Sequence, residues 1–354
     1  MVWSGPSRAL ATFACWVLVL TGLVPGRAWG HPVGSRLATA GPPATAERAA
    51  GGPPRAAAKV LDCGPLVGAV KGEPAGSPLG ASAALGPVRA SIAGTVPPGL
   101  AGLAGSVEHP VLTVVVGGRR VGRWPVALPA QAGPVGPAQP PGVVLATMGP
   151  STSTVPLCVA RFGVSHPVTA VLVATYSGGA HCCTWVAAYP VWPLSARLRA
   201  PVEQYLGDPG ARLQAGDGQA VLVTADDAFA YRFDAYAASG MPVRTLELAG
   251  DRFVATTRAH PALVAADAAT FWSAYLQVQS PEQGEGRGGG LGLLAAWVAD
   301  ECLLGRGTQA WAEVRHLEGR GLLTGGPAGQ AGPWPVGARY VAALRSFLRA
   351  RHYC

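Results

Sequence analysis

The chain has 354 residues, of which 49% are hydrophobic and 13% are charged. This apolar content is enough for a folded core and excludes a wholly disordered chain, and the low charge content excludes a long coiled coil. The formal net charge of +8 is not concentrated in a basic stripe. The densest cluster, Arg119, Arg120 and Arg123, follows a Gly-Gly turn, so we interpret it as a solvated hairpin tip and expect no nucleic-acid partner.

The N-terminus has the pattern of a secretory signal peptide over residues 1–30. Arg8 supplies a positive charge, residues 9–24 form an apolar run, and Ala28-Trp29-Gly30 offers small residues before a cut at His31. The apolar run is shorter than the ~20 residues that a membrane helix needs. We therefore expect a protein that is secreted or held at the outer face of the cell envelope. An uncleaved N-terminal anchor is the alternative, and it is the only membrane contact we expect.

The composition then divides the rest of the chain into three regions. Residues 31–58 are rich in Pro, Ala and Gly without periodicity, which predicts a disordered linker. Residues 59–260 read as a β-rich domain, and residues 261–354 read as a helical C-terminal region. The fold class that this order predicts is α+β, with an antiparallel β domain, propeller-like or sandwich, followed by a small group of helices.

Short apolar runs separated by turn residues carry the β prediction. The strongest signal is a hairpin, in which residues 111–116 and 119–124 flank Gly117-Gly118. Residues 129–142 are too rich in proline for regular structure and predict a loop or a break between two β subregions. Further strands are predicted at 88–96, 168–175, 185–189, 220–224, 229–236, 243–248 and 253–257. In the run 229–236, Tyr231 and Phe233 share a face, which we expect to lie in the core.

Four helices are predicted in the C-terminal region. Pro261 suits a first helical position, and the first helix extends to about Gln279. Apolar residues at helical spacing predict three further helices. The second helix ends at Gly305, the third begins near Thr308, and the fourth covers residues around 340–348.

The cysteine count suggests disulfides. Of seven cysteines, Cys15 lies in the expected signal peptide, and the even number that remains fits an oxidising compartment. They are Cys63, Cys158, Cys182, Cys183, Cys302 and Cys354. Six cysteines allow ~15 pairings. We expect Cys302 to pair with Cys354, and Cys63 and Cys158 to pair with Cys182 and Cys183 in some order. A bond between the adjacent Cys182 and Cys183 is a strained alternative.

Three sequence blocks resemble a family. They are Tyr176-Ser177-Gly178-Gly179-Ala180-His181-Cys182-Cys183-Thr184, the stretch from Gly216-Asp217-Gly218 to Tyr236-Ala237-Ala238-Ser239, and the helical run from Leu294 to Tyr353. Together they are similar to uncharacterised exported proteins of actinobacterial type with degenerate FG-GAP or VCBS-like repeats. The resemblance covers roughly residues 85–354. It implies an architecture of degenerate β repeats, but no activity.

The resemblance also implies an aspartate-rich turn of the form D-x-D-G-D-G-x-P-E before each of two strands, a pattern that suits calcium. Here the turn before Val168 has no acid, and the turn before Val221 keeps only Asp217. One carboxylate is too few for a calcium cage, so we expect no metal and no cofactor.

Candidate chemistry remains at a few polar residues. Asp226 and Asp227 precede an apolar, aromatic run and could act as acid and base, bind a ligand, or cap a turn. His181 lies beside Cys182 and Cys183, but adjacent strand residues point to opposite faces, which favours disulfides over a Cys–His nucleophile. The candidate binding residues are therefore Asp226, Asp227, His181 and Asp217, with no catalytic set.

These observations favour an exported binding or envelope-associated module that is not an enzyme, with a cell-envelope component or a carbohydrate as its ligand. The alternative is an extracellular hydrolase that uses Asp226 or Asp227 as its acid or base.

Overall fold

The computed structural model describes the greater part of the chain from residue 59 to the C-terminus. The described ranges are 59–68, 74–97, 105–128, 143–148, 154–163, 165–179, 182–192, 197–198, 200–216, 218–280, 289–325 and 332–354. Ala56–Cys354 forms one unit, and the expected signal peptide and linker lie outside the described residues, as does the predicted break at 129–142.

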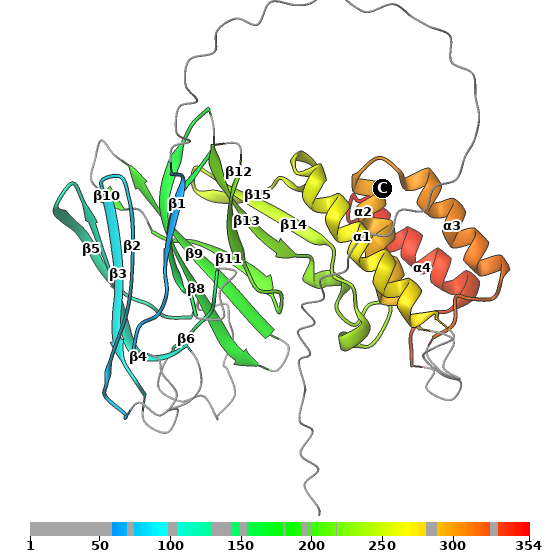
Figure 1. Ribbon diagram of the computed structural model, residues 1–354, viewed down its shortest axis with the longest axis horizontal. Coiled ribbons are helices and arrows are strands. Elements are labelled where there is room, and N and C mark those ends of the chain that lie inside the picture. Colours follow the sequence, from blue (N-terminus) through cyan, green and yellow to red (C-terminus); the bar gives the residue numbers. More distant parts are fainter. Residues whose placement is uncertain are drawn as a thin grey trace, which may run out of the picture. The chain divides into compact units, whose positions relative to one another are not determined.

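Most strands of the described residues pair antiparallel into one sheet, here called the long sheet (Figure 1). Its order is β1-β7-β8-β6-β4-β3-β2, with β5 on β4, β9 on β8, and both β10 and β11 on β9. The strands are β1 Leu61–Gly64, β2 Pro78–Leu85, β3 Val88–Thr95, β4 Ser106–Val116, β5 Arg119–Pro125, β6 Val143–Leu145, β7 Leu157–Phe162, β8 Val168–Gly179, β9 Cys182–Trp192, β10 Arg197–Leu198 and β11 Val202–Gly207.

The central strands of the long sheet are buried on both faces. In β8, Val171 and Val173 point into one apolar cluster together with Ile92 of β3, whereas Leu172 points into a second cluster together with Leu222. Successive strand residues alternate between faces, so a strand covered on both sides reads as a continuous apolar run. This is why the run at β8 contains no polar position before Thr175 other than Thr169.

A second, short sheet packs on this central layer. It consists of β12 Arg212–Gly216, β13 Gln219–Ala225, β14 Val243–Ala249 and β15 Arg252–Ala255, in that order. Leu222 and Leu246 face the long sheet, while Val221 and Val223 face the other way, toward Val264. The short sheet is therefore sandwiched between the long sheet and the helices.

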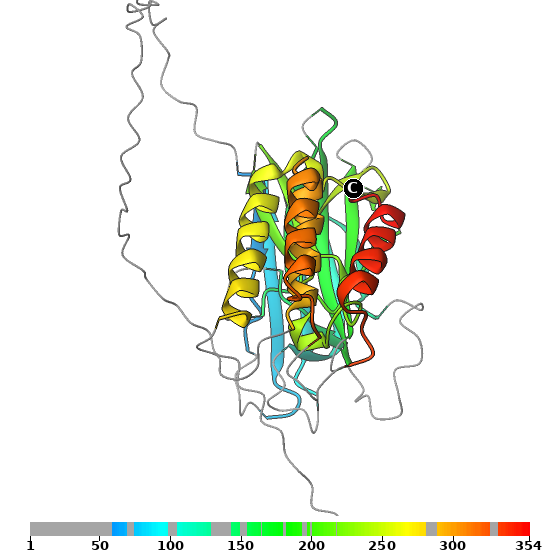
Figure 2. The same cartoon turned by 90° about the vertical axis from the view of Figure 1, so that its right-hand side faces the viewer.

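The helices cover the outer face of the short sheet (Figure 2). They are α1 Pro261–Val278, α2 Leu291–Leu303, α3 Gly307–Gly319 and α4 Gly337–Ala350. Their own core contains Tyr275, Leu294 and Tyr340, and the Tyr340 hydroxyl donates to the Leu291 carbonyl at 2.9 Å. Among the described helices, none combines the length and the apolar character needed to cross a membrane.

The α+β class with C-terminal helices is confirmed, but the strand predicted at 229–236 is wrong. A one-turn 3-10 helix occupies Asp227–Phe229, and a second occupies Tyr236–Ala238. Between them Tyr231 has a φ of 57°, a left-handed conformation that no strand accommodates. Tyr231 is therefore 52% exposed, whereas Phe233 is buried as expected.

The disulfides confirm one expected pairing and correct the other. Cys302 is bonded to Cys354, which ties the end of α2 to the C-terminal segment. Cys63 is bonded to Cys158, so the expected pairing of these two residues with Cys182 and Cys183 is wrong. The reason is the register, since β1 pairs with β7 and places Cys63 directly opposite Cys158, a neighbour relation that sequence spacing does not reveal.

Candidate functional site

Asp226 lies where strand β13 ends and the first 3-10 turn begins. Its side chain is the N-cap of this turn and accepts a hydrogen bond from the Ala228 amide at 3.2 Å. Aspartate is favoured here because its oxygen satisfies an amide that has no partner within the turn. The residue is only 7% exposed, so its charge needs further partners.

Those partners come from the C-terminal segment, residues 351–354. Helix α4 ends in a Schellman motif, in which the amide of His352 donates to the Arg349 carbonyl and that of Tyr353 donates to the Leu348 carbonyl. His352 takes the left-handed position of this motif, with a φ of 59°. The reversal of the chain directs Arg351 and Tyr353 toward Asp226.

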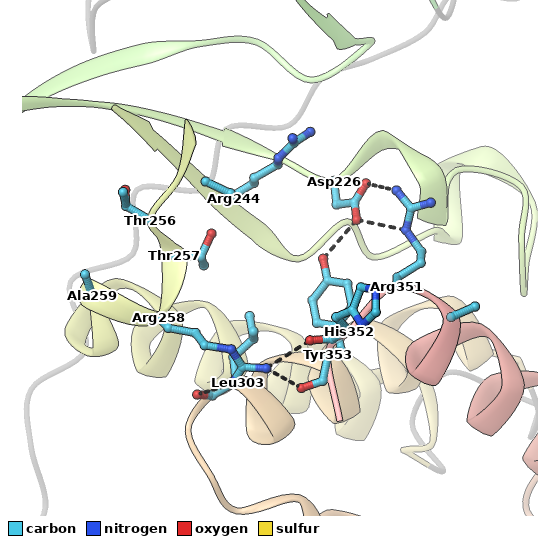
Figure 3. A pocket seen from close by; sticks show the side chains of 12 residues that line it. Asp226, Arg244, Thr256, Thr257, Arg258, Ala259, Leu303, Arg351, His352 and Tyr353 are labelled. Carbon is cyan, nitrogen blue, oxygen red and sulfur yellow. Dashed lines mark hydrogen bonds and ion pairs between the residues drawn. The ribbon is translucent and has the colours of Figure 1, made fainter. Parts of the chain in front are cut away.

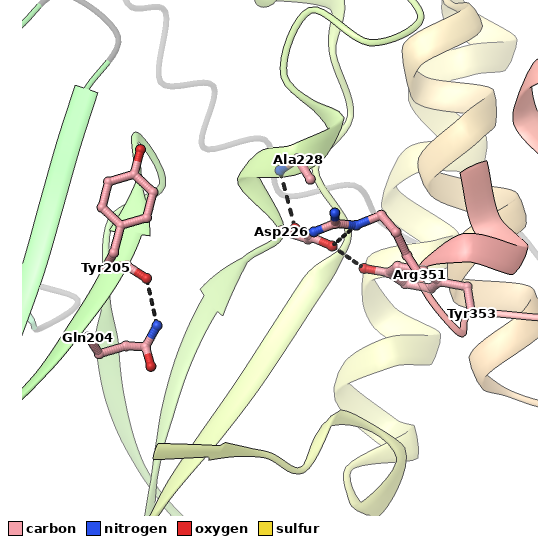
Figure 4. Close-up of polar contacts among 6 residues, drawn as sticks. All are labelled: Gln204, Tyr205, Asp226, Ala228, Arg351 and Tyr353. Atoms are coloured by element: carbon pink, nitrogen blue, oxygen red, sulfur yellow. Dashed lines mark hydrogen bonds and ion pairs between the residues drawn. The ribbon is translucent and has the colours of Figure 1, made fainter. Parts of the chain in front are cut away.

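These three side chains form what we call the Asp226 cluster (Figure 4). The Arg351 guanidinium donates to both carboxylate oxygens of Asp226, at 3.1 and 3.3 Å, and the Tyr353 hydroxyl donates at 3.0 Å. Burial, followed by the nearby Asp226 carboxylate, raises the pKa of Tyr353. The hydroxyl therefore stays neutral and remains a donor. The carboxylate of Asp226 is fully engaged in holding the C-terminal segment against the short sheet.

A pocket of about 720 Å³ opens beside the Asp226 cluster (Figure 3). Strands β14 and β15 and the turn after β15 contribute one side, and the end of α2 and the C-terminal segment contribute the other. Arginines supply most of its charge, since Asp226 is the only acidic residue among the lining residues that the structure describes. The lining residues are Asp226, Arg244, Ala255, Thr256, Thr257, Arg258, Ala259, Leu303, Ala350, Arg351, His352 and Tyr353.

Arg258 is fixed at the rim of this pocket by backbone carbonyls. Its guanidinium donates to the carbonyl of Leu303 at 3.3 Å, of His352 at 3.0 Å and of Tyr353 at 2.8 Å. Carbonyl oxygens orient a guanidinium without neutralising its charge. Arg258 thus links the turn after β15 to both α2 and the C-terminal segment while it remains a full positive charge.

Asp227 lies beside Asp226 but in different surroundings. Its carboxylate accepts a hydrogen bond from the Asp208 amide at 3.1 Å. The absence of a side chain at Gly207 allows this contact, because a Cβ there would lie 2.0 Å from the Asp227 carboxyl carbon. The φ of Gly207, 77°, also favours glycine. After the effect of burial, Asp227 and Asp208 further raise the pKa of Tyr205. Both aspartates of the predicted pair therefore cap backbone amides, and only Asp226 lines the pocket of Figure 3.

The structure does not describe the placement of the other predicted site residues. His181 and Asp217 lie outside the described residues, and so does the side chain of Cys182. Cys183 is disulfide-bonded, and its sulfur lies 3.4 Å from the Tyr205 hydroxyl. Within the part of the chain that the structure describes, no group of three or more His, Cys, Asp or Glu side chains is placed to hold a metal ion.

A second pair of aspartates lies in the helices, and one of the two bonds to the short sheet. Asp267 of α1 accepts a hydrogen bond from the Val243 amide of β14 at 2.6 Å. Asp300 of α2 is fully buried nearby, and burial, followed by the Asp267 carboxylate and then Glu301, raises its pKa to about 9. Burial likewise raises the pKa of Asp267. Asp300 is therefore protonated at neutral pH.

Comparison with known proteins identifies only the helical end of the chain. Residues 264–352 match the family model described as the sll0997 C-terminal domain. No curated protein and no solved structure matches the chain. The matched segment begins in α1 and includes Arg351 and His352, but it does not include Asp226, Arg244 or Arg258.

Sequence reasoning did not anticipate most of the pocket residues. Arg244 and Arg258 come from strand and turn segments whose alternation shows only which positions are apolar. Outside the pocket, Asp300 gave a usable signal, because the adjacent acids Asp300 and Glu301 inside the apolar run of α2 are expected at buried, partnered positions. Arg351 and Tyr353 gave none, since their partner Asp226 is more than a hundred residues away in sequence.

Proposed function

We propose that the protein is an exported, non-catalytic binding module of the cell envelope, and that the pocket beside the Asp226 cluster is its binding site. The observation that carries the proposal is the state of Asp226. Its carboxylate accepts from Arg351, Tyr353 and the Ala228 amide, so it is committed to a structural role. A general acid or base must instead reach a proton on a substrate.

Export is supported by the N-terminal pattern and by the disulfides. The bonds Cys63–Cys158 and Cys302–Cys354 close loops across sequence separations of 95 and 52 residues. Such bonds form and persist in oxidising compartments. The resemblance to exported proteins with FG-GAP or VCBS-like repeats also supports the proposal that the protein is exported.

The hydrolase alternative loses its best residues in this geometry. Asp227 caps the Asp208 amide and does not line the pocket with Asp226. An enzyme should instead bring its acid and base to the floor of one concave site. The arginines that line the pocket are suited to holding a ligand by charge and hydrogen bonds.

The test of export is the intact mass of the full chain expressed in a bacterium that secretes it, measured without reductant. We expect a species that begins at His31 and is lighter by at least about 4 Da than the reduced chain, because each disulfide removes two hydrogens. A cell-associated chain that retains residues 1–30 and has fully alkylatable cysteines would overturn export.

The test of binding is co-sedimentation of the purified protein with isolated envelope fragments. We expect the protein in the pellet, with no soluble fragments released over time. Protein that stays in the supernatant would contradict the binding proposal. Fragment release that Asp227→Asn abolishes would establish the hydrolase in its place.

A further inference from the structure

We infer that the pocket beside the Asp226 cluster binds an organic anion through a phosphate or carboxylate group held between Arg244 and Arg258. This inference rests on the proposed function in that it concerns the same pocket, and it adds the chemical class of the ligand. Figure 3 shows Arg244 extending from β14 on one side of the pocket and Arg258 bound to the backbone on the other.

The charge balance of the pocket is the first step. Arg351 is neutralised by Asp226, in an ion pair of 3.1 Å. Arg258 is held by three carbonyls, and among the described residues neither Arg258 nor Arg244 forms an ion pair with a carboxylate. The pocket therefore has two uncompensated positive charges and no free negative charge among its described lining residues.

The side chain of Arg244 is the second step. Within the described part of the chain, its guanidinium has no hydrogen-bond partner, although the residue is half-buried in the wall of the pocket. A guanidinium has five N–H donors in a planar fork that matches the oxygens of a phosphate or a carboxylate. Arg244 thus presents this fork without having to break an existing bond.

Thr257 adds a neutral donor on the same wall. Its hydroxyl oxygen accepts a hydrogen bond from the Thr245 amide at 3.1 Å, which fixes the side chain and leaves the hydroxyl hydrogen available to a ligand. By contrast, the Tyr353 hydroxyl already donates to Asp226. Among the described lining residues, the donors that can reach a ligand therefore include those of Arg244, Thr257 and the unused N–H groups of Arg258.

The volume of the pocket sets the size of the ligand. At about 720 Å³ it is far larger than an inorganic anion and lies in the range of ~300–1,000 Å³ that is typical of sites for organic ligands. Part of the lining is apolar, from Ala255, Ala259, Leu303 and Ala350. The ligand is thus an anionic group attached to a larger body that can cover this apolar surface.

The experiment uses two probes with the same apolar body, phenyl phosphate and benzoate, with benzyl alcohol as the neutral reference. Binding to the purified full chain is measured by calorimetry at constant ionic strength. We expect one or both anions to bind and benzyl alcohol not to bind. Tighter binding of phenyl phosphate would assign the ligand to phosphate esters, and tighter binding of benzoate would assign it to carboxylates.

The decisive variant is Arg244→Gln, which keeps a polar side chain with N–H donors but shortens it and removes its charge. We expect it to weaken anion binding by at least about tenfold, the loss expected for a charge-assisted hydrogen bond. Arg252→Gln is the matched control, because Arg252 is an exposed residue of the neighbouring strand β15 and does not line the pocket. Thermal unfolding of both variants shows that they are folded.

Two results would overturn the inference. One is that neither anion binds more tightly than benzyl alcohol. The other is that Arg244→Gln and Arg252→Gln weaken binding equally, which would mean attraction to surface charge in general. Failure of the inference is distinguishable from failure of the proposed function. Co-sedimentation with envelope fragments that persists without anion binding leaves the proposed function standing. Anion binding that depends on Arg244 without co-sedimentation leaves only the inference standing.

Discussion

Two interfaces of the short sheet hold the molecule together by different physics. Toward the long sheet, Leu222 and Leu246 meet Leu172 in an apolar layer that excludes water. Toward the C-terminal segment, the contact is polar, formed by Asp226 with Arg351 and Tyr353. An apolar layer tolerates any residues of suitable volume, whereas a buried charge is stable only with its specific partners. The apolar layer therefore determines how the two sheets stack, and the polar contact determines where the C-terminal segment lies against the short sheet.

The apolar layer is broken most directly by Leu172→Ala. Leu172 is fully buried between the two sheets, and removal of its side chain leaves a cavity that packed neighbours cannot fill. We expect a loss of about 2–5 kcal/mol in the free energy of unfolding, measured by urea denaturation with an unchanged m-value. The control is Leu276→Ala in α1, where the side chain is 51% exposed and the expected loss is small. Equal losses in the two variants would contradict the layered packing.

The variant Asp300→Asn tests how the helices contribute to the pH dependence of stability. Asp300 of α2 is buried, and its pKa is raised to about 9. In the unfolded chain this carboxyl titrates near 3.8, so between about pH 4 and pH 9 the folded state binds more protons than the unfolded state. The free energy of unfolding of the unmodified protein should therefore fall as the pH rises, by up to about 1.4 kcal/mol per pH unit from this group.

Asparagine removes this titration, so the variant should gain stability relative to the unmodified protein between pH 6 and pH 8. Urea denaturation at several pH values measures the difference in slope. Asp251→Asn is the control, since Asp251 lies exposed in the turn between β14 and β15. Identical slopes for the unmodified protein and Asp300→Asn would mean that Asp300 is ionised in the folded state.

The two interfaces also differ in how far the sequence predicts them. Apolar alternation and turn residues located most strands of both sheets, because burial imposes a period of two on the chain. The spacing of Phe229 and Phe233 predicts a strand after Asp226, but the chain forms a 3-10 turn there. The aromatic residues pack on Phe347 of α4, a tertiary contact that no local pattern encodes.

The site shows the same limit more sharply. The two adjacent acids before an apolar run indicate that Asp226 is a candidate, but its role depends on residues at the far end of the chain. The same holds for Arg258, whose partners include the carbonyls of His352 and Tyr353. The Cys302–Cys354 bond was predictable, because the predicted helical region 261–354 contains no other cysteine.

The polar contact is broken by Asp226→Ala. This change leaves the buried Tyr353 hydroxyl and the Ala228 amide without their acceptor and Arg351 without its counter-ion. Because the Arg351 side chain is 40% exposed, water compensates part of the loss, and we expect about 2 kcal/mol in the free energy of unfolding. Urea denaturation measures it. Asp227→Ala, which removes one bond to the Asp208 amide, should cost less and serves as the control.

The smallest effect is expected at His352, which holds the left-handed position of the Schellman motif with a φ of 59°. Glycine adopts this conformation without a steric penalty, so His352→Gly should raise the free energy of unfolding by about 0.5–1 kcal/mol. The gain depends on the left-handed conformation at position 352 being present in the folded protein. A destabilised His352→Gly variant would therefore mean that the imidazole itself holds the C-terminal segment in place. Thermal unfolding next to His316→Gly, a position in the last turn of α3 where glycine should destabilise, separates the two cases.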